Sequence, residues 1–157
     1  MRVFVDADSC PVLREILDAA ARLDVNVVLV CDDSHEFVPT KGVEVLVTDT
    51  GKEAADLVIA NRAAAGDLVV TQDAGAASIA LARGARALSP RGDEFTRDAM
   101  PGLLMRRHVA AKIRRAGGRT RGPREFAKED RMRFRERFRA VLRELGRSSQ
   151  NKPSAKK

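Results

Sequence analysis

The sequence contains no tryptophan, no tyrosine and only two cysteines among its 157 residues. Without Trp and Tyr, any aromatic platform for stacking nucleic-acid bases has to come from the six phenylalanines. The two cysteines, Cys10 and Cys31, are too few for a disulfide framework and form no Cys-x-x-Cys pair. We therefore expect a protein of the reducing cytoplasm, with a core built from aliphatic side chains.

Long apolar runs are also missing from the chain. No stretch approaches the roughly 18 apolar residues that span a bilayer, so we expect no membrane segment. The N-terminus carries one basic residue and charges from Asp6 onward, so we expect no signal peptide there. The length fits one domain, which we place at residues 1–147, followed by a polar, disordered tail at 148–157.

Positive charge is in excess, and it is unevenly distributed. Residues 101–157 carry 19 Lys and Arg against 5 Asp and Glu, a net charge of +14. Residues 1–100 carry 10 Lys and Arg against 17 Asp and Glu, a net charge of −7. This asymmetry favours contact with nucleic acid through the basic half. The alternative is that the arginines only solvate helices, although a solvated face usually mixes both signs.

Short apolar segments alternate with helical patterns along the acidic half. Strands are expected at 3–5, 25–31, 43–47, 68–70 and 85–88, and helices at 11–20, 52–65 and 76–83. This alternation predicts an α/β fold with a mostly parallel sheet and flanking helices. Two more helices, 103–116 and 125–145, form a basic C-terminal helical extension over residues 103–147. The apolar positions of the second one are Met132, Phe134, Phe138, Val141, Leu142 and Leu145.

Carboxylates follow two of the predicted strands. Asp6 and Asp8 come after the first strand, and Asp73 comes after a later one. Ligands of parallel sheets bind beyond the carboxyl ends of strands, so these side chains are expected to meet at one edge. Glu53 and Asp56 are three residues apart near the start of a helix and share one face. Such a carboxylate set repels itself without a cation, and its hard oxygen ligands suit Mg²⁺ or Mn²⁺.

Three functional hypotheses are compatible with these carboxylates. A metal site of this kind can activate water for phosphodiester cleavage, although Asp8 alone could cap a helix and Glu53 alone could complement a helix dipole. Asp-Ala-Asp after the first strand also resembles haloacid-dehalogenase-type phosphatases, with Asp6 as the nucleophile. That chemistry needs a positioned lysine, and neither Lys41 nor Lys52 follows a strand in the expected place. The third hypothesis is a non-catalytic RNA-binding module.

Several segments together resemble the YaiI/YqxD family of uncharacterised bacterial proteins. The matching segments are Val5–Val12, Gly51–Asp56, Gly66–Asp73, Leu88–Gly92, Gly122–Pro123 and Asp130–Arg131. The resemblance covers nearly the whole chain, up to about Leu145. Single pieces of this pattern are common in proteins, whereas the combination is specific.

The YaiI/YqxD family is similar to PIN-like domains. Their metal-dependent ribonucleases place acidic residues after the first strand, on a middle helix and after the fourth strand. The resemblance implies that Asp6, Asp73 and one of Glu53 and Asp56 hold the metal ion, with Asp8 assisting. It also implies a nuclease that acts on RNA rather than DNA. The family pattern has Asp where this chain has Glu53, so the choice between the two helix carboxylates stays open.

Four arginines are candidates for contact with a phosphate backbone. Arg91 lies in a loop after a strand, and Arg119, Arg121 and Arg124 surround the glycines between the two C-terminal helices. Guanidinium groups and exposed backbone N–H groups in such loops suit phosphate. The alternatives are a solvated turn at Arg91 and a simple linker between the helices. Exposed arginines of this loop should be replaceable with little loss of stability.

Overall fold

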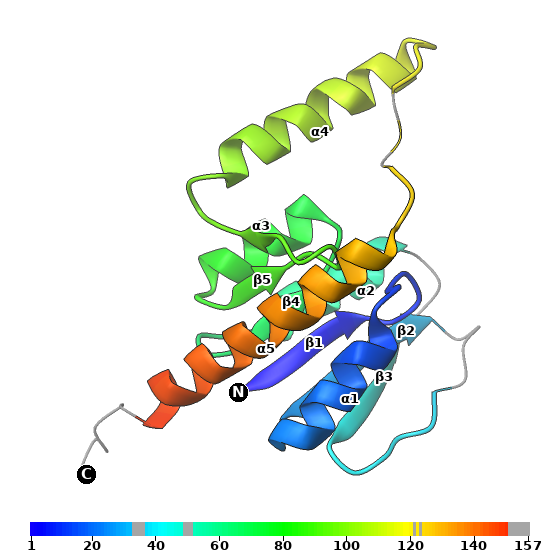
Figure 1. Cartoon of the computed structure of the whole chain (residues 1–157). Coiled ribbons are helices and arrows are strands. Elements are labelled where there is room, and N and C mark those ends of the chain that lie inside the picture. The colour runs from blue at the N-terminus through cyan, green and yellow to red at the C-terminus, as the bar shows by residue number, and fades with distance from the viewer. Residues whose placement is uncertain (33–36, 49–51, 121, 123, 151–157) are drawn as a thin grey trace.

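The computed structural model describes residues 1–32, 37–48, 52–120, 122 and 124–150. Within these residues the chain forms a six-stranded sheet and five helices (Figure 1). The predicted α/β class with flanking helices is confirmed. In this part of the chain none of the helices combines the length and the apolar character that crossing a bilayer requires.

The sheet has the strand order β3-β2-β1-β4-β5-β6. The strands are β1 (Arg2–Asp6), β2 (Asn26–Asp32), β3 (Val43–Thr48), β4 (Leu68–Val70), β5 (Arg86–Leu88) and β6 (Glu94–Phe95). Every neighbouring pair is parallel except β5 and β6, which are antiparallel. The mostly parallel sheet is therefore as predicted, and the two-residue β6 is an addition that its short sequence did not indicate.

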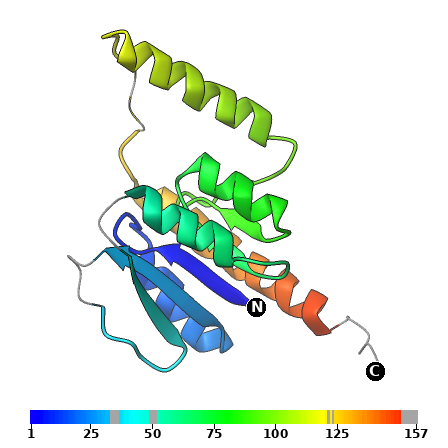
Figure 2. The same cartoon turned by 180° about the vertical axis from the view of Figure 1, so that it is seen from behind.

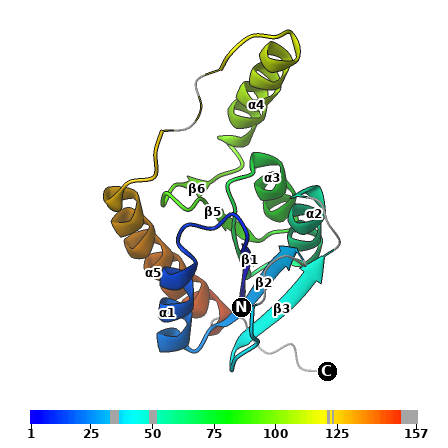
Figure 3. The ribbon, with the colours of Figure 1, turned by 90° about the vertical axis from the view of Figure 1, so that its right-hand side faces the viewer.

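Helices cover both faces of this sheet (Figures 2 and 3). The helices are α1 (Leu13–Leu23), α2 (Lys52–Arg62), α3 (Ala74–Ala82), α4 (Met100–Arg115) and α5 (Lys128–Gln150). Side chains alternate along β1, so Val3 and Val5 pack on the α1 and α5 side while Phe4 packs on the α2 side. Burial on both faces explains why the central strands are apolar throughout.

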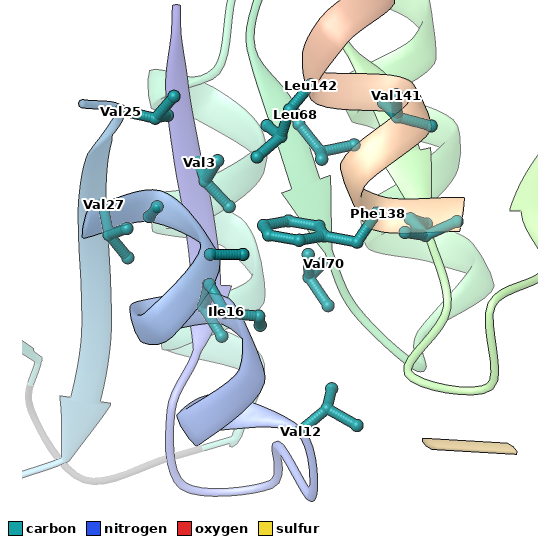
Figure 4. Packing of buried hydrophobic residues seen from close by; sticks show 14 of the residues in the cluster. Val3, Val12, Ile16, Val25, Val27, Leu68, Val70, Phe138, Val141 and Leu142 are labelled. Atoms are coloured by element: carbon teal, nitrogen blue, oxygen red, sulfur yellow. The ribbon is translucent and has the colours of Figure 1, made fainter. Parts of the chain in front are cut away.

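The core on the α1 and α5 side is aliphatic apart from phenylalanine (Figure 4). Ile16 of α1 and Phe138 and Leu142 of α5 are buried against the strands. Val3 of β1 and Leu68 of β4 belong to the same buried cluster. Helix α5 therefore contributes to the same core as the first strand and the first helix.

Helix α5 differs from its predicted form at both ends. It begins at Lys128 rather than at residue 125, and it continues to Gln150, into the segment 148–157 that we expected to be a disordered tail. Residues 151–157 of that segment lie outside the described residues. Five of the six predicted apolar positions are buried, whereas Met132 is exposed. Phe134 and Phe138 stack with their ring centroids 5.3 Å apart, which anchors the first half of the helix.

Helix α4 stands apart from the two layers (Figures 1 and 3). All of its residues are described, and Met100 alone among them is buried. It contacts α3, while Met105, Val109 and Ile113 remain exposed. The predicted basic helix at 103–116 thus exists, with three more residues at its start.

Candidate functional site

The strand order places a crevice at the carboxyl ends of β1 and β4. From β1 the chain proceeds outward to β2 and β3, and β4 then returns to the other side of β1. Connections diverge at such a switch point, which leaves a space where ligands bind in open parallel sheets. A pocket of about 760 Å³ lies here, and its lining includes Asp6, Asp8, Asp56 and Asp73. We call it the acidic pocket.

Four of the five predicted carboxylates therefore line one pocket. The fifth, Glu53, belongs to the backbone of α2, but its side chain lies outside the described residues. The structure also adds Asp32, at the end of β2, to the lining. In the sequence Asp32 directly follows the predicted strand 25–31. It was not predicted as a site residue, because it also begins a polar loop.

Short hydrogen bonds hold the loop after β1. The Ser9 hydroxyl donates to Oδ2 of Asp6 at 2.6 Å, and the backbone N–H of Asp32 donates to Oδ2 of Asp8 at 2.7 Å. The side-chain amide of Gln72 donates to the Ser9 carbonyl at 3.0 Å. The loops after β1, β2 and β4 are thereby tied together. The N-cap position of α1 is Val12, which has no capping side chain, and one oxygen of Asp8 bonds the backbone of β2.

One side-chain oxygen of Asp73 both caps a helix and forms an ion pair. Its Oδ1 accepts hydrogen bonds from the backbone N–H groups of Gly75 at 2.6 Å and Ala76 at 3.0 Å, which caps α3. The same atom pairs with Nη1 of Arg107, which reaches the pocket from α4. Burial opposes ionisation of Asp73, but Arg107 and the capping N–H groups outweigh it and hold its pKa below the usual value.

Gly75 leaves room for this ion pair. A Cβ atom at that position would lie 2.9 Å from Oδ1 of Asp73 and 3.1 Å from Nη1 of Arg107. Arg107 was not among the predicted site residues. Nothing in a basic amphipathic helix indicates which of its arginines points back to a strand end 34 residues earlier.

Asp56 is the carboxylate most affected by the pocket. Burial raises its pKa to about 6, and the charges of Asp73 and Asp6 add to the increase. A hydrogen bond from Thr71 and the charge of Arg107 act in the opposite direction. These carboxylates therefore repel one another as predicted, and a cation in the pocket would relieve that repulsion.

We expect Asp56→Asn to stabilise the metal-free protein by about 1–2 kcal/mol near pH 8. The pKa of Asp56 is about 6 in the fold and 3.8 in its absence. Its negative charge therefore destabilises the fold above pH 6, and the gain from removing it fades as the pH falls toward 4. Urea unfolding in EDTA at pH 8 and at pH 4 measures this difference in the free energy of unfolding. The exposed Asp98→Asn is the control. A variant less stable than the parent at pH 8 would contradict it.

The donor set suits a hard divalent cation by its chemistry, since carboxylate oxygens are the preferred ligands of Mg²⁺ and Mn²⁺. Among the described residues, no three acidic, His or Cys side chains are close enough together to surround one metal ion. The guanidinium group of Arg107 already places a positive charge in the pocket, where it forms an ion pair with Asp73. Metal binding would therefore draw the carboxylates closer and compete with this pair.

Two of the four predicted phosphate-binding arginines pair with a buried acidic residue. Arg91 and Arg124 both bond the buried carboxylate of Asp130, at 2.6 and 2.7 Å to its Oδ2. Both are therefore structural partners of Asp130, while the Arg124 side chain remains 59% exposed. Arg119 is exposed, and Arg121 lies outside the described residues.

Comparison with known proteins identifies the family. The model of the family described as uncharacterised BCR, YaiI/YqxD family, matches residues 4–144. The chain belongs to the YaiI/YqxD family. Among curated relatives, a UPF0178 protein of Shouchella clausii is 42% identical over 143 residues, covering 91% of this chain and 93% of the relative. One of Halalkalibacterium halodurans is 44% identical over 140 residues, covering 89% of each chain.

These YaiI/YqxD relatives confirm the family resemblance, and their names assign no activity. A UPF0178 protein of Bacillus velezensis is 43% identical over 151 residues, covering 95% of this chain and 90% of its own. Among solved structures, Rae1 (YacP) from Bacillus subtilis aligns with a TM-score of 0.41 at 17% identity, covering 92% of this chain and 99% of that one. A likeness at this level carries no functional argument, so the function has to be argued from the acidic pocket.

Proposed function

We propose that this chain is a divalent-metal-dependent nuclease of PIN-like type that hydrolyses phosphodiester bonds of RNA in the acidic pocket. The observation that carries the proposal is that Asp6, Asp8, Asp56 and Asp73 line one pocket at the switch point of a parallel sheet. The raised pKa of Asp56 supports it, because burial first and then the charges of Asp73 and Asp6 disfavour its ionised form, which a cation in the pocket would favour.

Asp6 and Asp73 would hold Mg²⁺ or Mn²⁺ together with Asp56 or Glu53. Such an ion, when bound, supplies positive charge for activating water and for stabilising the leaving oxygen. Oδ2 of Asp73 takes no hydrogen bond from the described residues and is the oxygen available to a cation. Asp8, fixed by the backbone of Asp32, would assist by orienting water.

Arg107 would bring substrate into this negative pocket. It is the one cationic side chain among the described residues that line it, and its side chain is 55% exposed. A guanidinium group bonds phosphate oxygens well, so Arg107 can exchange Asp73 for a substrate phosphate. The reaction is expected in the cytoplasm, where Cys10 and Cys31, both free thiols, would stay reduced.

The test is an assay of the purified protein on single-stranded RNA with Mn²⁺, Mg²⁺ or EDTA. We expect degradation with either metal and none with EDTA. An aryl phosphate monoester assayed beside it should remain intact. Release of phosphate from the monoester would favour the phosphatase hypothesis with Asp6 as nucleophile, and RNA binding without turnover under any metal would favour a non-catalytic module.

A further inference from the structure

The arginines of α5 fall into two groups by their partners. Arg131 pairs with Glu15 at 2.6 Å, Arg133 pairs with Asp130 at 3.1 Å, and Arg137 pairs with Glu94. Arg135, Arg139, Arg143 and Arg147 have no carboxylate partner within the described part of the chain. The first group stabilises the fold, which leaves the charge of the second group available to a ligand.

Two of these arginines, Arg135 and Arg139, face α1 across a groove of about 260 Å³. Arg14 and Arg22 of α1 line the opposite wall, and neither forms an ion pair with any described residue. Figure 3 shows α1 and α5 side by side on one face of the sheet. We call this cleft, lined by Arg14, Arg22, Arg135 and Arg139, the arginine groove.

The charge of the arginine groove suits a polyanion. Its walls also contain Asp18 and Glu15, but Glu15 is already neutralised by Arg131. Like charges that line one groove repel one another, and a chain of phosphates would relieve that repulsion. Along α1, eight residues separate Arg14 from Arg22, or about 12 Å at the rise of an α-helix. An elongated groove of this kind matches a backbone better than a single phosphate.

The segment that follows β1 connects the acidic pocket to the arginine groove along the chain. Ser9 lines the pocket, and α1 begins four residues later at Leu13, so that Arg14 lies in its first turn. We propose that the arginine groove binds the phosphate backbone of single-stranded RNA and leads it to the acidic pocket. This inference rests on the proposed function for the identity of the polyanion, and it moves the docking surface from the predicted loop at Arg119–Arg124 to the α1 and α5 face.

The test measures binding of a labelled single-stranded RNA in EDTA, so that cleavage plays no part. The variants are Arg135→Gln with Arg139→Gln on α5 and, separately, Arg14→Gln with Arg22→Gln on α1. The matched control is Arg106→Gln with Arg115→Gln, two exposed arginines of α4. Each groove pair should weaken binding by at least about fivefold and lower the salt-dependence slope by about 1.4, at 0.7 per phosphate on a single strand. The control should keep the slope of the parent.

Three outcomes would overturn the proposed role of the arginine groove. The first is a parent-like affinity and slope in both groove pairs. The second is a loss of binding in the control as large as in the groove pairs, which would place RNA on α4 or make the effect a general one of net charge. The third is a parent protein that shows no salt-dependent RNA binding. If groove binding holds but Mn²⁺ elicits no cleavage, the nuclease proposal fails and the RNA-binding groove stands.

Discussion

Asp6→Asn and Asp73→Asn are each expected to reduce metal-dependent RNA cleavage by at least about 100-fold. Asparagine keeps the shape of the side chain but removes the negative charge that a hard cation requires. It also keeps an oxygen that can accept the Ser9 hydroxyl at position 6 and cap α3 at position 73. The fold should therefore survive while the chemistry is lost, as measured by cleavage rate and circular dichroism.

The matched control for these two variants is Asp98→Asn, which removes one exposed carboxylate away from the acidic pocket. It changes the net charge by the same amount and should cleave RNA at the rate of the parent. Full activity in Asp6→Asn or in Asp73→Asn would rule out a role for that side chain in holding the metal ion. Equal loss in all three variants would instead point to a nonspecific charge effect.

Asp130→Asn is expected to lower the melting temperature at pH 7 by roughly 5–10 °C. The Asp130 side chain is fully buried and neutralises Arg91, Arg124 and Arg133. It also accepts the backbone N–H of Ala127 at 3.0 Å, just before α5 begins. Without its charge, three guanidinium groups remain together with no buried counter-ion. Differential scanning calorimetry measures the change, with Asp98→Asn as the control.

The effect of Asp130→Asn should depend on pH in a defined direction. The hydrogen bond from Arg124, the backbone N–H of Ala127 and the nearby arginine charges lower the pKa of Asp130 to about 2. A carboxyl group whose pKa falls on folding stabilises the fold above its ordinary pKa of 3.8, and this contribution is lost as the pH falls toward 2. The melting temperatures of parent and variant should therefore converge in acid. A constant difference from pH 7 to pH 2 would contradict this origin.

The sheet and the strand-end carboxylates could be predicted because their signals are local. Strand β2 is a continuous apolar run, which is typical of a strand buried on both faces. Asp6 ends β1 and Asp73 follows β4, so the parallel direction of the strands sufficed to bring them to one edge. The start of α5 was predicted three residues too early. The carboxylate of Asp130 accepts the backbone N–H of Ala127 at this helix end, and the spacing of apolar residues does not reveal such a contact.

The partners of the arginines could not be predicted, because they depend on contacts between distant parts of the chain. Arg131 meets Glu15 across 116 positions of sequence, and Arg91 meets Asp130 across 39. In the sequence all the arginines of the basic half look alike. The fold divides them into those that neutralise buried acids and those, such as Arg135 and Arg139, that keep their charge free. Arg91 and Arg124 belong to the first group, since both pair with Asp130, and their contact with a phosphate backbone stays a prediction.

Cleavage of one single-stranded RNA by the parent and by Asp73→Asn, each with Mn²⁺ and with EDTA, tests the central claim most directly. The acidic pocket account predicts cleavage in one of the four reactions, the parent with Mn²⁺. Cleavage by the parent in EDTA at the same rate, or by Asp73→Asn in Mn²⁺ at the rate of the parent, would contradict it.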